Sequence, residues 1–207
     1  MSTLKINQAV SALKNGELVI LPTETVYGIF AVANNQDAVE KLYKIKGRPK
    51  DKALNLNVST YEEILKYSIN QPVYLKKLVD TFLPGALTII LQASSQVPSW
   101  IHEGKTTVGF RMPAMKITQG VIVQTGTLVG PSANLTGQPS PIMFTDISNE
   151  ILQEVSLALQ DDGVYGQDST IIDLSGQEAQ ILRQGQITKE EIVKKVPELN
   201  FGRDSIQ

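Results

Sequence analysis

Short apolar runs alternate along this chain with segments whose apolar residues recur every three or four positions. The runs are typical of strands and lie at 18–21, 54–58, 87–91, 107–111, 127–130, 169–174 and 179–182. Helical spacing and capping signals predict helices over 6–15, 36–46, 116–124 and 146–154, and others that begin at 60, 72 and 188. Because the two kinds of segment interleave without strict alternation, the pattern predicts an α/β domain with a mixed sheet.

Residues with special backbone chemistry mark where several of these elements begin or end. Gly47 and Pro49 end one helix, since glycine favours a C-terminal cap and proline cannot continue the helix. Thr60 and Glu63 have the spacing of a capping box and predict a helix start. A turn is expected at 162–163, where aspartate precedes glycine.

With 207 residues and 42% hydrophobic content, the chain is long enough for one domain with a buried core. We expect a single domain over 1–207, with its core in 6–196 and a tail in 197–207. There is no run of about 18 apolar residues, so no membrane span is expected. The N-terminus lacks a charged start followed by an apolar stretch, so no signal peptide is expected either. Together with the absence of cysteine, this predicts a cytoplasmic protein.

The chain has no cysteine and a single histidine, His102. The absence of cysteine excludes disulfides, thiol nucleophiles and thiolate metal sites, and one histidine cannot form the paired-imidazole sites of zinc hydrolases. A serine–histidine–aspartate triad would have to use His102, which the sequence places in a turn after Pro98. Imidazole or thiol catalysis is therefore disfavoured.

Positive charge is concentrated in one stretch of a chain whose net charge is -2. Residues 41–52 contain six cations and one acid, Asp51, so this stretch alone carries +5. Clustered like charges repel unless a counter-charge offsets them, which favours an anionic ligand. The alternative is a solvated lysine face on a helix.

Polar loops lie beside the predicted strands at 21–28, 46–49, 130–140 and 166–170, the last complemented by 182–185. The first directly follows a strand, and open α/β sheets bind ligands at the carboxyl ends of their strands. In the second, Lys46 offers a point charge and Arg48 a planar fork suited to phosphate. Each loop taken alone is also compatible with ordinary turns. The chain lacks a P-loop and a dinucleotide-binding glycine motif, so any triphosphate would be held by dispersed side chains.

A set of short motifs, in a fixed order from 18 to 185, gives the most specific signal. They are Pro22–Gly28, Lys46–Pro49, Leu83–Gly85 with Leu87 and Thr88, Val108–Pro113 around Arg111, Ser132–Asn134, Ser169 with Thr170, and Leu182 with Arg183. In this order and spacing the chain resembles the YrdC-like threonylcarbamoyl-AMP synthases, in their short single-domain form. The resemblance implies a YrdC-like twisted mixed sheet flanked by helices, with a concave cationic cavity.

The resemblance also implies an enzyme, a nucleotidyltransferase that makes threonylcarbamoyl-AMP and pyrophosphate from L-threonine, bicarbonate or carbon dioxide, and ATP with Mg2+. The product would serve threonylcarbamoyladenosine modification of tRNA, carried out with partner proteins. All the reactants are anionic, and like charges about 4 Å apart repel by roughly 4 kcal/mol at an effective dielectric near 20. We therefore expect cations from distant loops to converge on one hollow, where catalysis depends on alignment and charge compensation.

The residues implied by motif position fall into three sets. The expected catalytic cations are Lys46, Arg48 and Arg111. The expected threonine-binding residues are Thr25, Asn57, Arg111, Gly130 and Ser169. The expected nucleotide-binding residues are Arg48, Lys52, Thr107, Ser132, Asn134, Ser140 and Arg183, and the resemblance does not identify metal ligands. We expect Lys46 and Arg48 to be exposed, so that their replacement by alanine weakens ATP binding and leaves the fold intact.

Five positions depart from the family pattern. Phe30 stands where glycine is common, Ala53 where proline is usual, Asn57 and Met115 where histidine is common, and Asp168 where glutamate is usual. Ala53 and Asn57 lie near the expected threonine site. These two departures therefore bear on the affinity for threonine, and on substrate identity, more than on the nucleotide site.

Two other functions fit part of the pattern. The cationic stretch could hold tRNA or double-stranded RNA in a YrdC-like protein without synthase activity. Against this interpretation stand the 6% aromatic content and a pI of about 5.5, which a dedicated RNA-binding protein would not show. A carbamoyl-transfer domain, as in the hydrogenase-maturation relatives, is disfavoured because those are long chains with zinc-binding regions, and this chain has 207 residues and no cysteine.

Overall fold

The computed structural model describes residues 3–161 and 166–202. Its strands are β1 (Val19–Leu21), β2 (Gly28–Val32), β3 (Leu56–Asn57), β4 (Ser68–Ile69), β5 (Leu87–Ala93), β6 (Thr107–Arg111), β7 (Leu128–Val129), β8 (Leu157–Ala158), β9 (Thr170–Asp173) and β10 (Gln180–Arg183). Its helices are α1 (Thr3–Lys14), α2 (Gln36–Lys46), α3 (Tyr61–Tyr67), α4 (Leu75–Phe82), α5 (Ser99–His102), α6 (Lys116–Thr125), α7 (Asn149–Leu152) and α8 (Lys189–Lys195), with a 3-10 turn, η1 (Phe144–Asp146).

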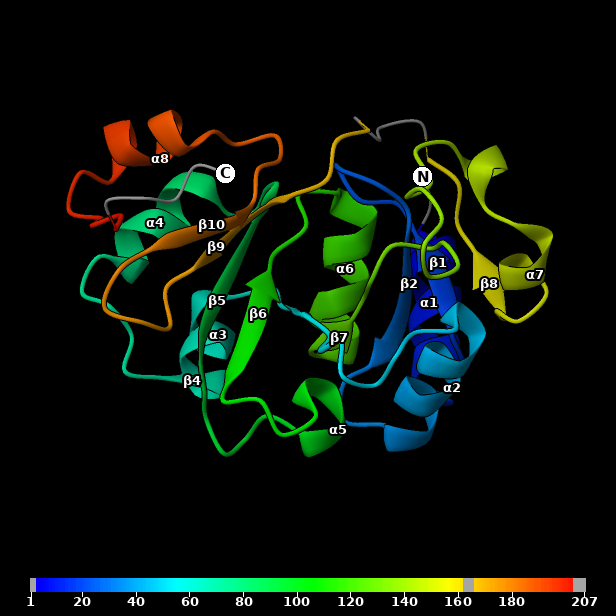
Figure 1. The fold of residues 1–207 in the computed structure, drawn as a ribbon. Helices are drawn as coiled ribbons and strands as arrows, with labels where there is room; N and C mark the ends of the chain where they lie inside the picture. The colour runs from blue at the N-terminus through cyan, green and yellow to red at the C-terminus, as the bar shows by residue number, and fades with distance from the viewer. Residues whose placement is uncertain (1–2, 162–165, 203–207) are drawn as a thin grey trace.

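The strands form one twisted mixed sheet, and helices lie against it along its whole length (Figure 1). The strand order is β10-β9-β5-β6-β3-β7-β2-β1-β8, and β4 pairs with β5. The pairs β1 with β8, β3 with β6 and β5 with β9 are parallel, and the others are antiparallel. The predicted α/β class with a mixed sheet is confirmed.

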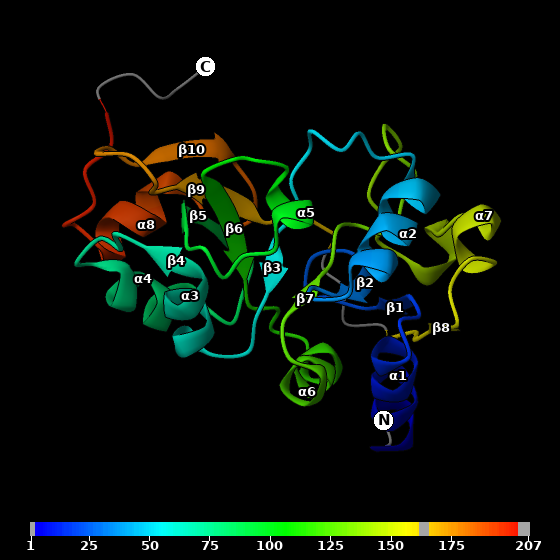
Figure 2. The same cartoon turned by 90° about the horizontal axis from the view of Figure 1, so that it is seen from below.

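Alternate residues of β1 face opposite layers of the molecule. Ile20 belongs to a large apolar cluster that includes residues of α2, while Val19 and Leu21 belong to a smaller cluster with α1 and α6. Figure 2 shows α2 on one side of β1 and β2, with α1 and α6 on the other side. A strand that is buried on both faces needs apolar residues at every position, which explains the uninterrupted run at 18–21.

The centre of the sheet is built from its shortest strands. β3 pairs in parallel with β6 and antiparallel with β7, and β3 and β7 contain two residues each. The strands β10, β9, β5 and β6 are therefore joined to β2, β1 and β8 through these two short strands. Asn57, a predicted threonine-binding residue, lies in this central link.

Several helix boundaries follow the capping signals in the sequence. α2 ends at Gly47, whose left-handed φ of 56° lets its N–H bond to the carbonyls of Lys44 and Tyr43. The capping box of Thr60 and Glu63 is present at the start of α3. A second capping box, formed by Thr188 and Glu191, begins α8. The predictions made from these signals are confirmed.

Other elements differ from the sequence pattern. β2, β4 and β8 are not predicted: β4 and β8 have two residues each, and β2 is an apolar run like 18–21 whose first residue falls in the polar loop expected at 21–28. The helix expected over 146–154 is reduced to η1 and α7, and α5 replaces the turn expected around His102. The helix expected from Pro72 begins at Leu75, because the Pro72 carbonyl accepts the Leu75 N–H in a preceding turn. The turn expected at 162–163 lies outside the described residues.

The last described residues pack against the β9–β10 hairpin. Leu199 is buried, the Ala179 N–H donates to the Asn200 carbonyl, and Lys189 Nζ lies 4.7 Å from the centre of the Phe201 ring. Residues 197–202 were expected to form a tail, but their described contacts place them in the packed structure. Residues 203–207 lie outside the description.

In the part of the chain that the structure describes, no helix is long and apolar enough to cross a membrane. The longest described helix, α1, has 12 residues, whereas a bilayer crossing takes about 20.

Candidate functional site

Three neighbouring strands place a polar side chain at the same level of the sheet. Arg111, the last residue of β6, is paired with Thr88 on β5 and with Asn57 on β3. Because paired residues direct their side chains to the same face, these three side chains form a row, which we call the Arg111 row. Thr88 and Asn57 are buried, and the Arg111 side chain is 13% exposed. The sequence predicted Arg111 and Asn57 but gave Thr88 no role.

The loop that follows β1 folds onto the Arg111 row. Arg111 Nη2 donates hydrogen bonds to Thr25 Oγ1 at 2.5 Å, Glu24 Oε1 at 2.8 Å and Thr23 Oγ1 at 3.4 Å. The two threonine hydroxyls are 3.0 Å apart and bonded to each other. The structure thus brings Thr25 against Arg111, and it adds Glu24, which had no predicted role. In the sequence, the signal that could have pointed to Glu24 is a carboxylate between two threonines in a loop without a lysine.

Two buried nitrogens of the Arg111 row have no hydrogen-bond partner among the described residues: Arg111 Nε and Asn57 Nδ2. A buried polar group left without a partner costs about 1–3 kcal/mol. Both atoms are donors, so a ligand group that satisfies them must be an acceptor. A carboxylate has this chemistry.

At Thr88, the Arg111 row contacts the segment that precedes β9. Thr88 Oγ1 and Ser169 Oγ are 2.9 Å apart and hydrogen-bonded. Arg183, the last residue of β10, donates from Nε to the Ser169 carbonyl at 3.0 Å and from Nη2 to Ser169 Oγ at 3.1 Å. Arg183 also forms an ion pair with Asp168 at 3.5 Å. Two predicted residues, Ser169 and Arg183, therefore lie in direct contact beside the row.

Lys46 is buried, with 3% of its surface exposed, and its ammonium group holds the loop at 132–134. Lys46 Nζ donates to the carbonyls of Ser132 and Asn134, each at 2.5 Å, and to Asn134 Oδ1 at 3.3 Å. Ser132 also forms a β-bridge with Gly28, at the far end of the loop that folds onto Arg111. The expectation that Lys46 is an exposed loop cation is wrong, because α2 ends with this side chain turned inward.

Arg48 binds the backbone of its own loop. Its Nε donates to the Lys52 carbonyl at 3.1 Å and its Nη2 to the Ala53 carbonyl at 2.8 Å. The Tyr43 hydroxyl donates to the same Lys52 carbonyl at 3.1 Å. Arg48 is half-buried rather than exposed, while the Lys52 residue faces solvent. Arg48 thereby fixes the loop that carries Lys52.

Lys46 should release its proton at a lower pH than an exposed lysine. Burial, with a smaller contribution from the charge of Arg48, lowers the pKa of Lys46 from 10.5 to about 8. Between these two values the unfolded chain keeps a proton that the folded protein has released. Stability should therefore rise with pH from about 8 towards 10.5 relative to a Lys46→Met variant. Denaturant unfolding of both proteins across this range tests the sign, and an identical pH dependence of the two would contradict it.

The predicted nucleotide-side residues are only partly brought together. Asn134 and Ser140 line one cavity of about 650 Å³, with residues of η1, α7 and the intervening loops. Ser132 lies beside it, since its Oγ donates to Asn134 Oδ1 at 2.5 Å. Thr107 is at the opposite end of β6 from Arg111, so the structure does not place it against the row.

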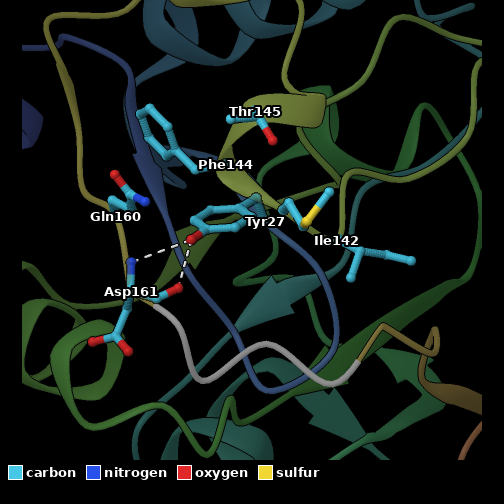
Figure 3. Close-up of a pocket in the computed structure, with 7 residues that line it drawn as sticks. Tyr27, Ile142, Phe144, Thr145, Gln160 and Asp161 are labelled. Carbon is cyan, nitrogen blue, oxygen red and sulfur yellow. Dashed lines mark hydrogen bonds between the residues drawn. The ribbon is translucent and has the colours of Figure 1, made fainter.

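A smaller cavity of about 280 Å³ lies next to Tyr27 (Figure 3). The Tyr27 hydroxyl donates to the Asp161 carbonyl at 2.6 Å and accepts the Asp161 N–H at 3.2 Å. The Tyr27 ring meets Phe144 edge to face, with centres 5.8 Å apart. Because Tyr27 belongs to the loop after β1, these contacts anchor that loop to Asp161 and Phe144.

Gly130, a predicted threonine-site residue, faces two side chains at close range. A Cβ at this position would overlap the Phe30 ring and lie 3.0 Å from Asn57 Nδ2. Gly130→Ala should therefore lower the free energy of unfolding by about 1–3 kcal/mol and weaken threonine binding by displacing Asn57. Gly176→Ala is a matched control, since its Cβ would meet nothing closer than 3.9 Å. Equal denaturation midpoints for the two variants would contradict this prediction.

The remaining departures from the family pattern have definite surroundings. The Phe30 ring packs against Gly28 and Gly130, so these two glycines provide the space that it fills. Asp168 retains a carboxylate, which pairs with Arg183. Met115 precedes α6, and its carbonyl accepts the Gln119 N–H, a contact that any side chain at position 115 allows.

The four key cations form two groups. Arg111 and Arg183 lie beside Thr88 and Ser169, while Lys46 and Arg48 lie near each other on the end of α2 and the loop that follows. The loop after β1 connects the two groups, because it contacts Arg111 and ends at Gly28, which forms the β-bridge with Ser132. Convergence of all four on one hollow stays a prediction.

Comparison with known proteins identifies the family. The sequence model of the Sua5/YciO/YrdC family, described as "Telomere recombination", matches residues 11–185. Threonylcarbamoyl-AMP synthase of Pyrococcus abyssi is 34% identical over 95% of this chain and 58% of its own length. The enzyme of the same name from Bacillus subtilis is 36% identical over 91% and 55% of the respective lengths. That of Vibrio campbellii is 33% identical over 86% and 97%.

Solved structures agree with this assignment. P. abyssi Sua5 complexed with L-threonine superimposes with a TM-score of 0.92 at 33% identity, over 98% of this chain and 60% of that one. The chain thus spans little more than half the length of the P. abyssi and B. subtilis relatives. With a family match over most of its residues, this chain belongs to the Sua5/YciO/YrdC family.

Proposed function

We propose that this chain is the catalytic unit of an L-threonylcarbamoyladenylate synthase. It makes threonylcarbamoyl-AMP and pyrophosphate from L-threonine, bicarbonate or carbon dioxide, and ATP. The observation that supports this most directly is the Arg111 row, with two buried donors that lack protein partners, in a fold that superimposes on a threonine-bound relative.

The threonine side of the proposed site is the Arg111 row and its surroundings. Arg111 binds the substrate carboxylate, and Asn57 Nδ2 supplies a further donor beside it. Thr25 and Ser169 place hydroxyl groups around this point, and Gly130 leaves room for Asn57. An arginine paired with a carboxylate forms a charge-assisted hydrogen bond, which is stronger than a neutral one.

The nucleotide side comprises the 132–134 loop, Ser140, Lys52 and Arg183. The threonine amine loses a proton and adds to carbon dioxide, and an oxygen of the resulting carbamate attacks the α-phosphorus of ATP. The new oxygen–phosphorus bond replaces the bond to pyrophosphate, which leaves with its electron pair. The chain aligns the reactants and offsets their negative charge, and Lys46 contributes by fixing Ser132 and Asn134.

We further propose that Mg2+ arrives with ATP as part of the substrate. The described residues contain no cluster of three or more histidine, cysteine, aspartate or glutamate side chains. Mg2+ commonly takes its ligands from substrate phosphates, water and one or two carboxylates.

The product would pass to partner proteins that modify tRNA, in the cytoplasm. This step needs no RNA-binding surface on the present chain. Exposed cations of 41–52 offer the alternative of direct contact with tRNA or double-stranded RNA.

Pyrophosphate release by the purified chain tests the proposal. With ATP, Mg2+, bicarbonate and L-threonine together, we expect pyrophosphate release and a product with the mass of threonylcarbamoyl-AMP. Omission of threonine, or of bicarbonate in carbon dioxide-free buffer, should stop it. No product with the complete set would disprove the proposal, and tRNA binding that is independent of ATP would then favour the RNA-binding alternative.

A further inference from the structure

Glu24 is a buried carboxylate whose two oxygens bind different parts of the site. Oε1 accepts from Arg111 Nη2 at 2.8 Å, and Oε2 accepts the N–H of Ala114 at 2.8 Å. Glu24 is 7% exposed, and its ion pair with Arg111 joins two side chains that are 10% and 13% exposed. An ionised carboxylate costs free energy when buried, unless it is paired and hydrogen-bonded as it is here.

These contacts connect three segments that are distant in the sequence. Glu24 belongs to the loop after β1, Arg111 ends β6, and Ala114 lies in the segment between β6 and α6. The orientation of the Arg111 guanidinium is therefore determined from the loop after β1 rather than by its own strand. On this guanidinium, Nη2 already meets three acceptors of the loop, whereas Nε has no partner among the described residues.

We propose that Glu24 is a positioning residue for the amino-acid carboxylate. By binding Nη2, it turns Arg111 so that Nε, together with Asn57 Nδ2 on the adjacent strand, is left to bind the carboxylate of the substrate. Glu24 itself does not touch the substrate. This inference rests on the proposed function, since it takes threonine as the ligand of the Arg111 row.

A purely structural ion pair makes different predictions. Loss of a structural pair would lower stability and leave the affinity of the folded protein for threonine unchanged. Loss of a positioning pair weakens threonine binding selectively and leaves ATP binding intact, because the polar contacts of Glu24 in the described structure go to Arg111 and Ala114 and not to Ser132, Asn134 or Ser140. A loss of threonine affinity without a loss of ATP affinity therefore distinguishes a positioning role from a purely structural one.

Calorimetry of ligand binding to the full chain measures this separation. Glu24→Gln removes the charge and keeps the size, and Glu24→Asp keeps the charge but shortens the side chain. Both should bind L-threonine at least about tenfold more weakly, as expected from the loss of a charged hydrogen bond, with the ATP dissociation constant within about twofold of wild type. Glu198→Gln, which breaks the exposed pair with Lys77, is the matched control and should bind both ligands normally.

Wild-type threonine affinity in both Glu24 variants, or an equal loss of ATP affinity, would overturn the inference. The two variants change different properties of the side chain, its charge and its length. Either one alone tests the inference if the other fails to fold. If the wild-type protein binds no threonine, the proposed function fails first, and the identity of the ligand in this inference fails with it.

Nitrogen-15 spectroscopy gives a readout that does not depend on activity. The Arg111 Nε–H signal, identified by its absence in Arg111→Lys, should exchange slowly with water in the free wild-type protein. In Glu24→Gln this exchange should accelerate, because the guanidinium is no longer fixed. Addition of threonine should shift the signal in the wild type and in Glu198→Gln. An unchanged Arg111 signal in Glu24→Gln would show that Glu24 does not position Arg111.

Discussion

Arg111→Met should reduce threonine-dependent pyrophosphate release to between about one tenth and one hundredth of the wild-type rate. The expected loss follows from removing a charged hydrogen-bond donor, which contributes up to about 3 kcal/mol. The variant also leaves the Glu24 carboxylate buried without its cation, so the free energy of unfolding should fall by about 3–5 kcal/mol. Pyrophosphate assays at saturating ATP and denaturant unfolding measure the two effects separately.

A double variant separates the two consequences of losing Arg111. Arg111→Met combined with Glu24→Gln removes both charges, so it should regain much of the lost stability without regaining activity. An Arg111→Met protein as stable as the wild type would contradict the assigned ion pair. The same holds if the double variant is no more stable than the single one.

Lys46→Met should be the second most damaging single change. The carbonyls of Ser132 and Asn134 would lose this donor in a part-buried environment, while Asn134 Oδ1 would keep its hydrogen bond from Ser132 Oγ. At about 1–3 kcal/mol for each of the two unpaired carbonyls, the free energy of unfolding should fall by about 2 kcal/mol or more. ATP binding should weaken as well, because the 132–134 loop would no longer be held in place. Denaturant unfolding and ATP calorimetry test both expectations.

Lys44→Met is the matched control for this change. Lys44 is in the same last turn of α2 but is exposed, so its replacement should alter stability by less than about 0.5 kcal/mol. If Lys46→Met were equally mild in stability and lost only ATP affinity, Lys46 would be a phosphate ligand rather than the anchor of a loop.

The local chemistry of the sequence predicted those parts of the fold that short-range signals determine. Gly47 and the capping box of Thr60 and Glu63 set helix boundaries through bonds within a few residues, so their positions could be predicted. β2 carries an apolar run like that of β1, and it was not predicted because the polar loop expected at 21–28 extends into its first residue. The length of β3 depends on its partners β6 and β7, which are distant in the sequence.

In the candidate site, too, some residues could be predicted from local motifs, while others depend on contacts between distant segments. Motif order identified Arg111, Ser169 and Arg183, and the structure brings these residues to one end of β6 and the neighbouring strands. The inward turn of Lys46 depends on carbonyls about 90 residues away, and no local pattern encodes such a contact. The pairing of Glu24 with Arg111 likewise joins residues whose proximity arises only when the loop after β1 folds across the sheet.

The two-residue strands at the middle of the sheet form a seam between two more extensive halves. A strand this short contributes few cross-strand bonds, so local opening there costs less than in the longer ladders on either side. Asn57 lies on this seam, and its unpaired amide belongs to the proposed threonine subsite. An amino acid bound there adds a bond where the backbone supplies fewest, so we expect occupancy of the subsite to reduce local opening between the two halves.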